Sequence, residues 1–333
     1  MSRDGEKVTV RAPASIANLG PGFDVFALAL SRPFDLLTVE ATAERRISLS
    51  VTGLDSASIP LAPEANTAGR VAELFMEAFD LSVGFRIDIH KGIPPGFGLG
   101  SSGADAAAAA YALNRLLDLE LPENGLISLA ARGEVAASEA AHADNVSASL
   151  LGGFTIVRSY DPVDALSYEP PGNLGICIAI PRIRIPTRKT ALARRSLPEK
   201  VTLSQLTHSV GHAASLVYGM MTGDIRIIGT AMNDIAIEPL RSQLIPGYDL
   251  VRAGALEQGA AGVAVCGAGP SVAAFFDTDE TGPEPILEAM AVGFGKAGVE
   301  SHTFTASPGR GTELVEERSW GRDGGWSDGA AWR

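Results

Sequence analysis

The amino-acid sequence predicts an α+β fold in two domains. A chain of 333 residues is long enough for two domains. Both halves mix strand and helix patterns, without the strict alternation that a doubly wound parallel sheet requires. Between the halves, residues 161–171 contain three prolines and little apolar pattern. We therefore expect an N-terminal domain of residues 1–165, a C-terminal domain of residues 166–306 and a loose tail of residues 307–333.

In the first half, alternating apolar residues predict strands at residues 8–12, 34–42, 47–52, 84–90 and 154–157. Glycine and proline punctuation predicts a polar loop at residues 13–24. Asn66 precedes an apolar-periodic helix and has a side chain suited to an N-cap. We expect two further helices, an alanine-rich one that ends near Leu117 and one over residues 122–142, before a short apolar segment at residues 145–151.

In the second half, short apolar runs predict strands at residues 174–180, 262–266, 271–276 and 299–304. Helical periodicity predicts helices at about residues 190–195, 203–221, 248–257 and 285–296. A turn of sequence Gly-Ala-Gly-Pro joins the second and third of these strands at residues 267–270.

Composition and charge narrow the classes of function. The net charge of −12 argues against a nucleic-acid or membrane partner, because such partners favour a basic surface. Cys177 and Cys266 lie far apart in apolar runs, which predicts buried thiols in a reducing cytoplasm and no metal–thiolate site. The first residues are charged, which predicts no signal peptide, and no apolar run is long enough to span a bilayer.

The stretch from Ile93 to Ala110 is the strongest functional signal. Prolines and glycines lead directly into an alanine-rich helix, in which Asp105 suits the first turn. Glycines let a ligand approach the backbone closely, and the start of a helix offers free N–H groups at its positive end. The stretch therefore predicts a site for an anion such as phosphate.

Three interpretations of this loop remain open from the residues alone. The glycines could serve only a turn. Gly98 to Gly103 also matches the G-x-G-x-x-G pattern of dinucleotide-binding proteins, but residues 94–97 separate it from the strand, and no acid follows at the end of a next strand. The third interpretation is a nucleoside-triphosphate site without the P-loop lysine, in which backbone N–H groups, a helix dipole and Mg²⁺ meet the phosphate charge.

A carboxylate for such a magnesium ion is available on the helix that follows. Glu134, Ser138 and His142 recur at a spacing of four residues and share one helical face. Ser102 offers a hydroxyl at the start of the preceding helix. Glu134 could equally be a solvated surface charge, and His142 could cap the end of its helix.

Several segments together resemble one enzyme superfamily, the GHMP kinases. They comprise residues 11–24, 94–104, 142–146 and 267–271. The first and third have the form found in homoserine kinases, and the correspondence runs in order from about residue 9 to residue 305. The resemblance implies a ribosomal-protein-S5-like N-terminal domain and a ferredoxin-like C-terminal domain. It also implies transfer of the γ-phosphate of ATP to the hydroxyl of L-homoserine, a step of threonine biosynthesis.

The resemblance further assigns site residues. Ser102 and Glu134 would ligate Mg²⁺, and Asn66 would lie near the adenine. The expected ATP-binding residues are Asn66, Pro94, Pro95, Gly96, Phe97, Gly98, Leu99, Gly100, Ser101, Ser102, Gly103 and Ala104. The expected substrate-binding residues are Asn18, Asp24, His142, Asn145, Arg194 and Arg241. The two arginines suit the substrate carboxylate, since a guanidinium group can bind it with two hydrogen bonds.

The resemblance also bears on the chemistry. Asn145 stands where many GHMP kinases have an aspartate base, and an amide cannot accept a proton. We therefore expect Asn145, Ser102 and Glu134 to form the catalytic set, with direct transfer of the hydroxyl proton to the γ-phosphate. Asp144 is expected to point elsewhere. Other hypotheses are a kinase for another small alcohol, a nicotinamide-dependent dehydrogenase and a non-catalytic ATP sensor. A homodimer in the cytoplasm is also expected.

Overall fold

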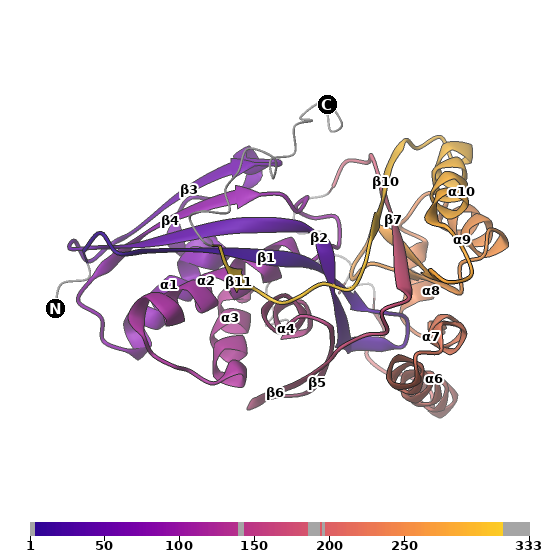
Figure 1. The fold of residues 1–333 in the computed structure, drawn as a ribbon, viewed down its shortest axis with the longest axis horizontal. Helices are drawn as coiled ribbons and strands as arrows, with labels where there is room; N and C mark the ends of the chain where they lie inside the picture. The colour runs from indigo at the N-terminus through magenta and orange to yellow at the C-terminus, as the bar shows by residue number, and fades with distance from the viewer. Residues whose placement is uncertain (1–3, 139–142, 186–193, 195–196, 316–333) are drawn as a thin grey trace.

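The computed structural model describes residues 4–138, 143–185, 194 and 197–315. Within these residues the chain forms two sheets with helices packed against them (Figure 1). The mixed α+β class and the two-domain arrangement expected from the sequence are confirmed. Of the expected helix at residues 190–195 only residue 194 is described, and the last part of the expected tail lies outside the described residues.

The first sheet has seven strands in the order β11-β1-β2-β4-β3, with β5 paired to β2 and β6 paired to β5. Its strands are β1 (Lys7–Asn18), β2 (Gly22–Thr42), β3 (Ile47–Gly53), β4 (Gly84–Lys91), β5 (Phe154–Tyr160), β6 (Val163–Tyr168) and β11 (Glu313–Leu314). Only the β3–β4 pair is parallel among these described pairings. One face of this sheet is covered by α1 (Thr67–Ala78), α2 (Ser101–Leu117), α3 (Glu123–Ser138) and α4 (Ala143–Leu151) (Figure 1).

The second sheet has four antiparallel strands in the order β10-β7-β9-β8. They are β7 (Leu174–Pro181), β8 (Gly262–Val265), β9 (Val272–Asp277) and β10 (Ser301–Ala306). The helices of this half are α6 (Leu203–Thr222), α7 (Ile225–Ala231), α8 (Glu238–Ser242), α9 (Tyr248–Glu257) and α10 (Pro283–Lys296). Because the first strand of this half lies inside the sheet beside the last, the topology is ferredoxin-like, as expected.

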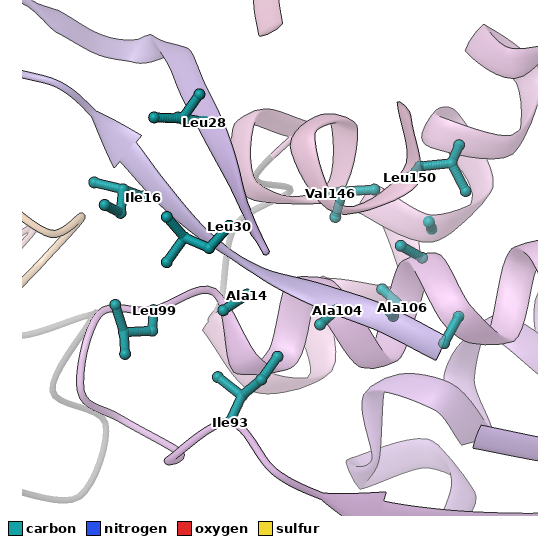
Figure 2. Close-up of a cluster of buried hydrophobic side chains, with 14 of the residues drawn as sticks. Ala14, Ile16, Leu28, Leu30, Ile93, Leu99, Ala104, Ala106, Val146 and Leu150 are labelled. Carbon is teal, nitrogen blue, oxygen red and sulfur yellow. The ribbon is translucent and has the colours of Figure 1, made fainter. Parts of the chain in front are cut away.

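The larger hydrophobic core lies between the first sheet and its helices. The alanines of α2 are fully buried and bring that helix close to the strands. Figure 2 shows Ile93 and Leu99, from the two ends of the glycine-rich loop, in the same cluster as Ile16 and Leu30 of the sheet. The loop is therefore anchored by apolar side chains at both ends, which fixes the start of α2.

Two predicted loops of the first half are strands instead. The polar loop expected at residues 13–24 is wrong, because β1 continues to Asn18 and β2 begins at Gly22. Ala14 and Ile16 are fully buried, and Pro13 is tolerated because the β1–β2 register shifts directly after it. The proline-rich segment expected between the halves contains β6, so the expected boundary at residue 165 falls inside a strand of the first sheet.

The sequence specified no secondary structure for residues 145–151, and it predicted a loose chain after residue 306. The apolar segment at residues 145–151 is helix α4. The chain after residue 306 is not loose up to residue 315, because it returns to the first sheet and β11 pairs with β1. Its glycines serve close packing, since a Cβ atom on Gly309 would lie 2.2 Å from the carbonyl oxygen of Leu30.

Candidate active site

The glycine-rich loop adopts a backbone conformation that requires glycine. Gly96, Gly98 and Gly100 have φ angles of +82°, +84° and +70°. A Cβ atom on Gly98 would lie 2.2 Å from the carbonyl oxygen of Cys266. The glycines therefore allow both the turns and the close approach of the loop to the second sheet.

Two neighbouring segments hold the loop in place. The backbone N–H of Ser15, on β1, donates to Leu99 O at 3.1 Å. The N–H of Ser271, at the start of β9, donates to Phe97 O at 3.3 Å. Helix α2 then begins at Ser101, and its N-cap Gly100 offers no side chain to the first N–H groups. This arrangement leaves the positive end of α2 suited to an anion.

Ser102 and Glu134, which the family resemblance pairs, meet at the start of α2. Ser102 Oγ donates to Glu134 Oε1 at 2.7 Å, and Glu134 is 4% exposed. Burial raises the pKa of Glu134 to about 8, although the hydrogen bond from Ser102 opposes this shift and the nearby Asp144 adds to it. A cation beside this carboxylate would reverse the effect of burial.

These two side chains fit a magnesium ion that binds mostly to its substrate. Hydroxyl and carboxylate oxygens are hard ligands of the kind that Mg²⁺ prefers. In the described part of the chain, no three His, Cys, Asp or Glu side chains gather into a metal-binding group. The remaining ligands of an ion held by Ser102 and Glu134 would therefore be phosphate oxygens and water.

Asn145 lies directly against the loop. Its Oδ1 accepts a hydrogen bond from Ser15 Oγ at 2.9 Å. A Cβ atom on Gly100 would lie 2.9 Å from that Oδ1, and one on Gly103 would lie 3.0 Å from Asn145 Cβ. The amide thus joins β1 to the start of α2.

Asp144 does not point away from the site, contrary to expectation. It is 2% exposed, and its pKa rises to about 6 because of burial and repulsion from Asp24, while Arg241 opposes the shift. The physical reason is that α4 begins at Ala143, so Asp144 and Asn145 both lie in its first turn. The sequence analysis did not predict this helix start, because the segment lacked a clear helical period.

A group of charged side chains from both halves lies beside Asp144. Arg194 pairs with Asp24, with Nη2 and Oδ2 2.5 Å apart. Asn18 Nδ2 and Arg241 Nη1 both donate to the carbonyl oxygen of Gly267, at 3.1 Å and 2.7 Å. Residues expected on the substrate side are thus brought together from positions far apart in the chain.

Arg241 is buried yet keeps a free donor. It is 8% exposed, and burial lowers its pKa, while the carboxylates of Asp24 and Asp144 oppose this shift. Its Nε has no hydrogen-bond partner in the described residues. An unpaired buried donor is costly, so this nitrogen is suited to an incoming anion.

Two aromatic residues that the sequence prediction missed complete this group. The guanidinium carbons of Arg194 and Arg241 lie 5.7 Å and 5.1 Å from the ring centroid of Phe23, within the range of a cation–π interaction. Tyr160 donates its hydroxyl to the carbonyl oxygen of Asp24 at 2.7 Å. The sequence offered one sign of the role of Phe23, because this residue directly precedes Asp24, which was expected to bind the substrate.

Two predicted residues have a different status. Asn66 is the N-cap of α1, since its Oδ1 accepts from the N–H groups of Ala68 and Gly69 at 3.0 Å and 3.2 Å. Its Nδ2 donates to Pro60 O at 2.9 Å, so a contact with adenine stays a prediction. His142 lies outside the described residues.

Comparisons with known proteins identify the family to which the chain belongs. The family profile of the GHMP kinases N terminal domain matches residues 66–153, and that of the GHMP kinases C terminal matches residues 216–291. A homoserine kinase from Halorubrum lacusprofundi is 43% identical over 311 residues, covering 93% of this chain and 100% of that protein. The chain belongs to the homoserine kinase family of GHMP kinases.

Other relatives agree. A homoserine kinase from Natronomonas pharaonis is 44% identical over 92% of this chain and 99% of that protein. The crystal structure of homoserine kinase from Cytophaga hutchinsonii superposes with a TM-score of 0.86 at 35% identity, covering 93% of this chain and 98% of that one. Separately, no helix in the described residues has both the length and the apolar character needed to cross a bilayer.

Proposed function

We propose that this protein transfers the γ-phosphate of ATP to the hydroxyl of L-homoserine and releases O-phospho-L-homoserine. The observation that carries the proposal is the juxtaposition of two unlike sites. A glycine loop with the Ser102–Glu134 pair lies beside a charged group that contains Asp24, Asp144 and Arg241. The first suits a nucleotide with its cation, and the second suits a small zwitterion.

On the nucleotide side, backbone N–H groups of residues 94–104 would hold the phosphates. The helix dipole of α2 favours their negative charge. Ser102 and Glu134 would hold Mg²⁺, which neutralises phosphate charge when bound. Asn66 would lie near the adenine.

On the acceptor side, Arg241 and Arg194 would bind the carboxylate of homoserine, and Asp24 would bind its ammonium group. The Asp24–Arg194 ion pair supports this assignment. A zwitterion can replace both halves of that pair, because its ammonium group would pair with Asp24 and its carboxylate with Arg194. Asn18, His142 and Asn145 would surround the hydroxyl end.

Positioning is the main contribution of the protein to the transfer. A loose phosphoryl transition state asks little of a base, so the hydroxyl proton can pass to the γ-phosphate. Asn145, which is fixed by Ser15 against the loop, would orient the reacting groups. The negative charge of Asp144 would stabilise the guanidinium group of Arg241 beside it.

The test is an ADP-release assay with Mg²⁺–ATP and a panel of alcohols: homoserine, shikimate, mevalonate and pantoate. We expect turnover with homoserine. Turnover only with another alcohol would replace homoserine as the substrate. A dehydrogenase would show no Mg²⁺-dependent ADP release and would bind NADH, whereas an ATP sensor would bind ATP without turnover.

A second copy of the chain is the partner that helix α6 favours. This helix carries no charged residue, although 20% of the chain is charged. Its exposed apolar residues are Leu203, Leu206, Val210, Tyr218 and Met221. In a chain with a net charge of −12, a neutral apolar face can meet its own copy without repulsion. Light scattering should give a dimer for the wild type and a monomer for Val210→Asp.

The expected cytoplasmic location stays a prediction.

A further inference from the structure

A buried ion cluster lies where β4 ends and α2 begins. It consists of Asp35 on β2, Lys91 at the end of β4 and Asp105 on α2. The side chains of Asp35 and Lys91 are fully buried, and that of Asp105 is 9% exposed. Lys91 Nζ donates to Asp35 Oδ2 and, at 2.7 Å, to Asp105 Oδ2. Asp105 therefore faces an internal cation rather than serving only the helix dipole.

The cluster holds the first residues of the glycine loop. Asp35 Oδ1 accepts the backbone N–H groups of Gly92 and Ile93 at 2.7 Å and 2.8 Å. These residues directly follow β4 and precede Pro94. Hydrogen bonds to an ionised group are about twice as strong as neutral ones, so the carboxylate fixes the direction in which the loop leaves the sheet.

The same cluster holds the end of the loop. Lys91 Nζ also donates to the carbonyl oxygen of Ser101 at 3.3 Å, and Ser101 Oγ donates to Ile93 O at 3.2 Å. Ser101 is the first residue of α2. The next residue is Ser102, whose hydroxyl donates to Glu134. A shift of Ser101 would therefore move Ser102 with it.

Stability alone does not account for such a cluster. Removing each ion from water is unfavourable, and apolar residues of similar volume often stabilise a fold as well as a buried ion group does. Burial raises the pKa of Asp105 to about 7, and its Oδ1 has no hydrogen-bond partner in the described residues. The cluster is thus costly, and its contacts go to both ends of the loop.

We propose that Asp35, Lys91 and Asp105 are positioning residues for the nucleotide. They fix the two ends of the loop so that its N–H groups and Ser102 surround the phosphates of Mg²⁺–ATP. The inference rests on the proposed function for the nucleotide, but it does not depend on which alcohol accepts the phosphate.

The test is a neutral variant that keeps the shape of the cluster, with Asp35→Asn, Lys91→Met and Asp105→Asn combined. Calorimetric titration with Mg²⁺–ATP should show a Kd raised about tenfold or more, because small displacements of positioning groups are costly. The kcat should fall by a similar factor, whereas the KM for homoserine should stay within about twofold. The melting temperature of the variant serves to show that it is folded at the temperature of the titration.

The matched control is Arg86→Met. It removes an exposed ion pair between Arg86 on β4 and Glu40 on β2, the strands that also carry Lys91 and Asp35, and in this pair Nη2 and Oε2 lie 2.5 Å apart. It should leave the Kd for Mg²⁺–ATP unchanged. A folded neutral variant with the wild-type Kd would overturn the proposal. So would a parallel rise in the KM of both substrates with a lower melting temperature, which is the pattern of a purely structural role.

If the neutral variant does not fold, two single variants decide. Asn at position 105 keeps an oxygen for Lys91, whereas Ala does not, so Asp105→Asn should bind Mg²⁺–ATP more tightly than Asp105→Ala. Equal affinities would count against the proposal. Should the wild type bind ATP but phosphorylate another alcohol, the proposed function fails while this titration still tests the cluster.

Discussion

The two sides of the site are built in different ways. The proposed nucleotide side is a contiguous loop whose backbone would face the phosphates, completed by one carboxylate at Glu134. The proposed acceptor side is made of side chains from separate elements, including Asp24 on β2, Asp144 on α4 and Arg241 on α8. Asn18 and Arg241 meet there at a single carbonyl oxygen, that of Gly267.

The two sides differ because phosphate recognition and amino-acid recognition depend on different groups of the protein. A phosphate is recognised by N–H groups, which every residue carries, so the loop depends on glycines rather than on particular side chains. An amino acid is recognised by charges at set places, so the acceptor side depends on individual residues. Substitutions on the two sides should therefore affect different kinetic constants.

The largest effect is expected at Glu134, the carboxylate of the nucleotide side. Glu134→Gln keeps the shape but removes the charge that would hold Mg²⁺, so kcat should fall about 10²- to 10³-fold in the ADP-release assay. Glu123→Gln, on the exposed first turn of the same helix, is the control and should keep full activity. Equal activity of the two variants would remove Glu134 from the proposed metal site.

A smaller effect, confined to the acceptor side, is expected for Arg241→Met. The KM for homoserine should rise about 10²-fold, since a buried donor for the carboxylate is lost. The KM for ATP should not change, because the loop makes none of its contacts through this side chain. Arg226→Met, on the exposed surface of α7, is the matched control. A parallel rise in both KM values would contradict the separation of the two sides.

Asp144→Asn tests whether the acceptor side supplies a base. We expect kcat to fall about tenfold, because one of the carboxylates beside Arg241 loses its charge while the proton still passes to the phosphate. Steady-state kinetics at saturating homoserine measures this. A loss on the order of 10³-fold or more would instead assign Asp144 as general base.

The smallest effect concerns pH on the nucleotide side. A carboxyl whose pKa is raised keeps its proton to a higher pH, so lowering the pH protonates more Glu134 and weakens the binding of a cation. With a pKa of about 8, the ionised fraction of Glu134 in the free enzyme falls between pH 8 and pH 7. The Mg²⁺ concentration for half-maximal ATP binding should therefore rise about fivefold over that interval. In Glu134→Gln this dependence should disappear.

Much of the nucleotide side could be predicted from the sequence. The glycine-to-alanine stretch predicted the loop and the start of α2, and the family resemblance singled out Glu134, although the residues alone left open that it was a solvated surface charge. Asn66 was predicted as an N-cap and forms that cap with the N–H groups of Ala68 and Gly69. Each of these signals is local, because caps, glycine turns and helical periods involve residues close in the chain.

The rest was decided by packing. Pairings such as Lys91 with Asp35, which are 56 residues apart, and Asn18 with Gly267, which are 249 apart, leave no periodic trace in the sequence. The helix at α4 turned Asp144 toward Arg241, and the chain after residue 306 joined the first sheet through close-packed glycines. Thus the sequence by itself determined most of the elements and the glycine-rich loop that leads into α2. The tertiary structure decided which charges meet, because ion pairs and buried donors depend on the positions of whole sheets and helices rather than on neighbours in the chain.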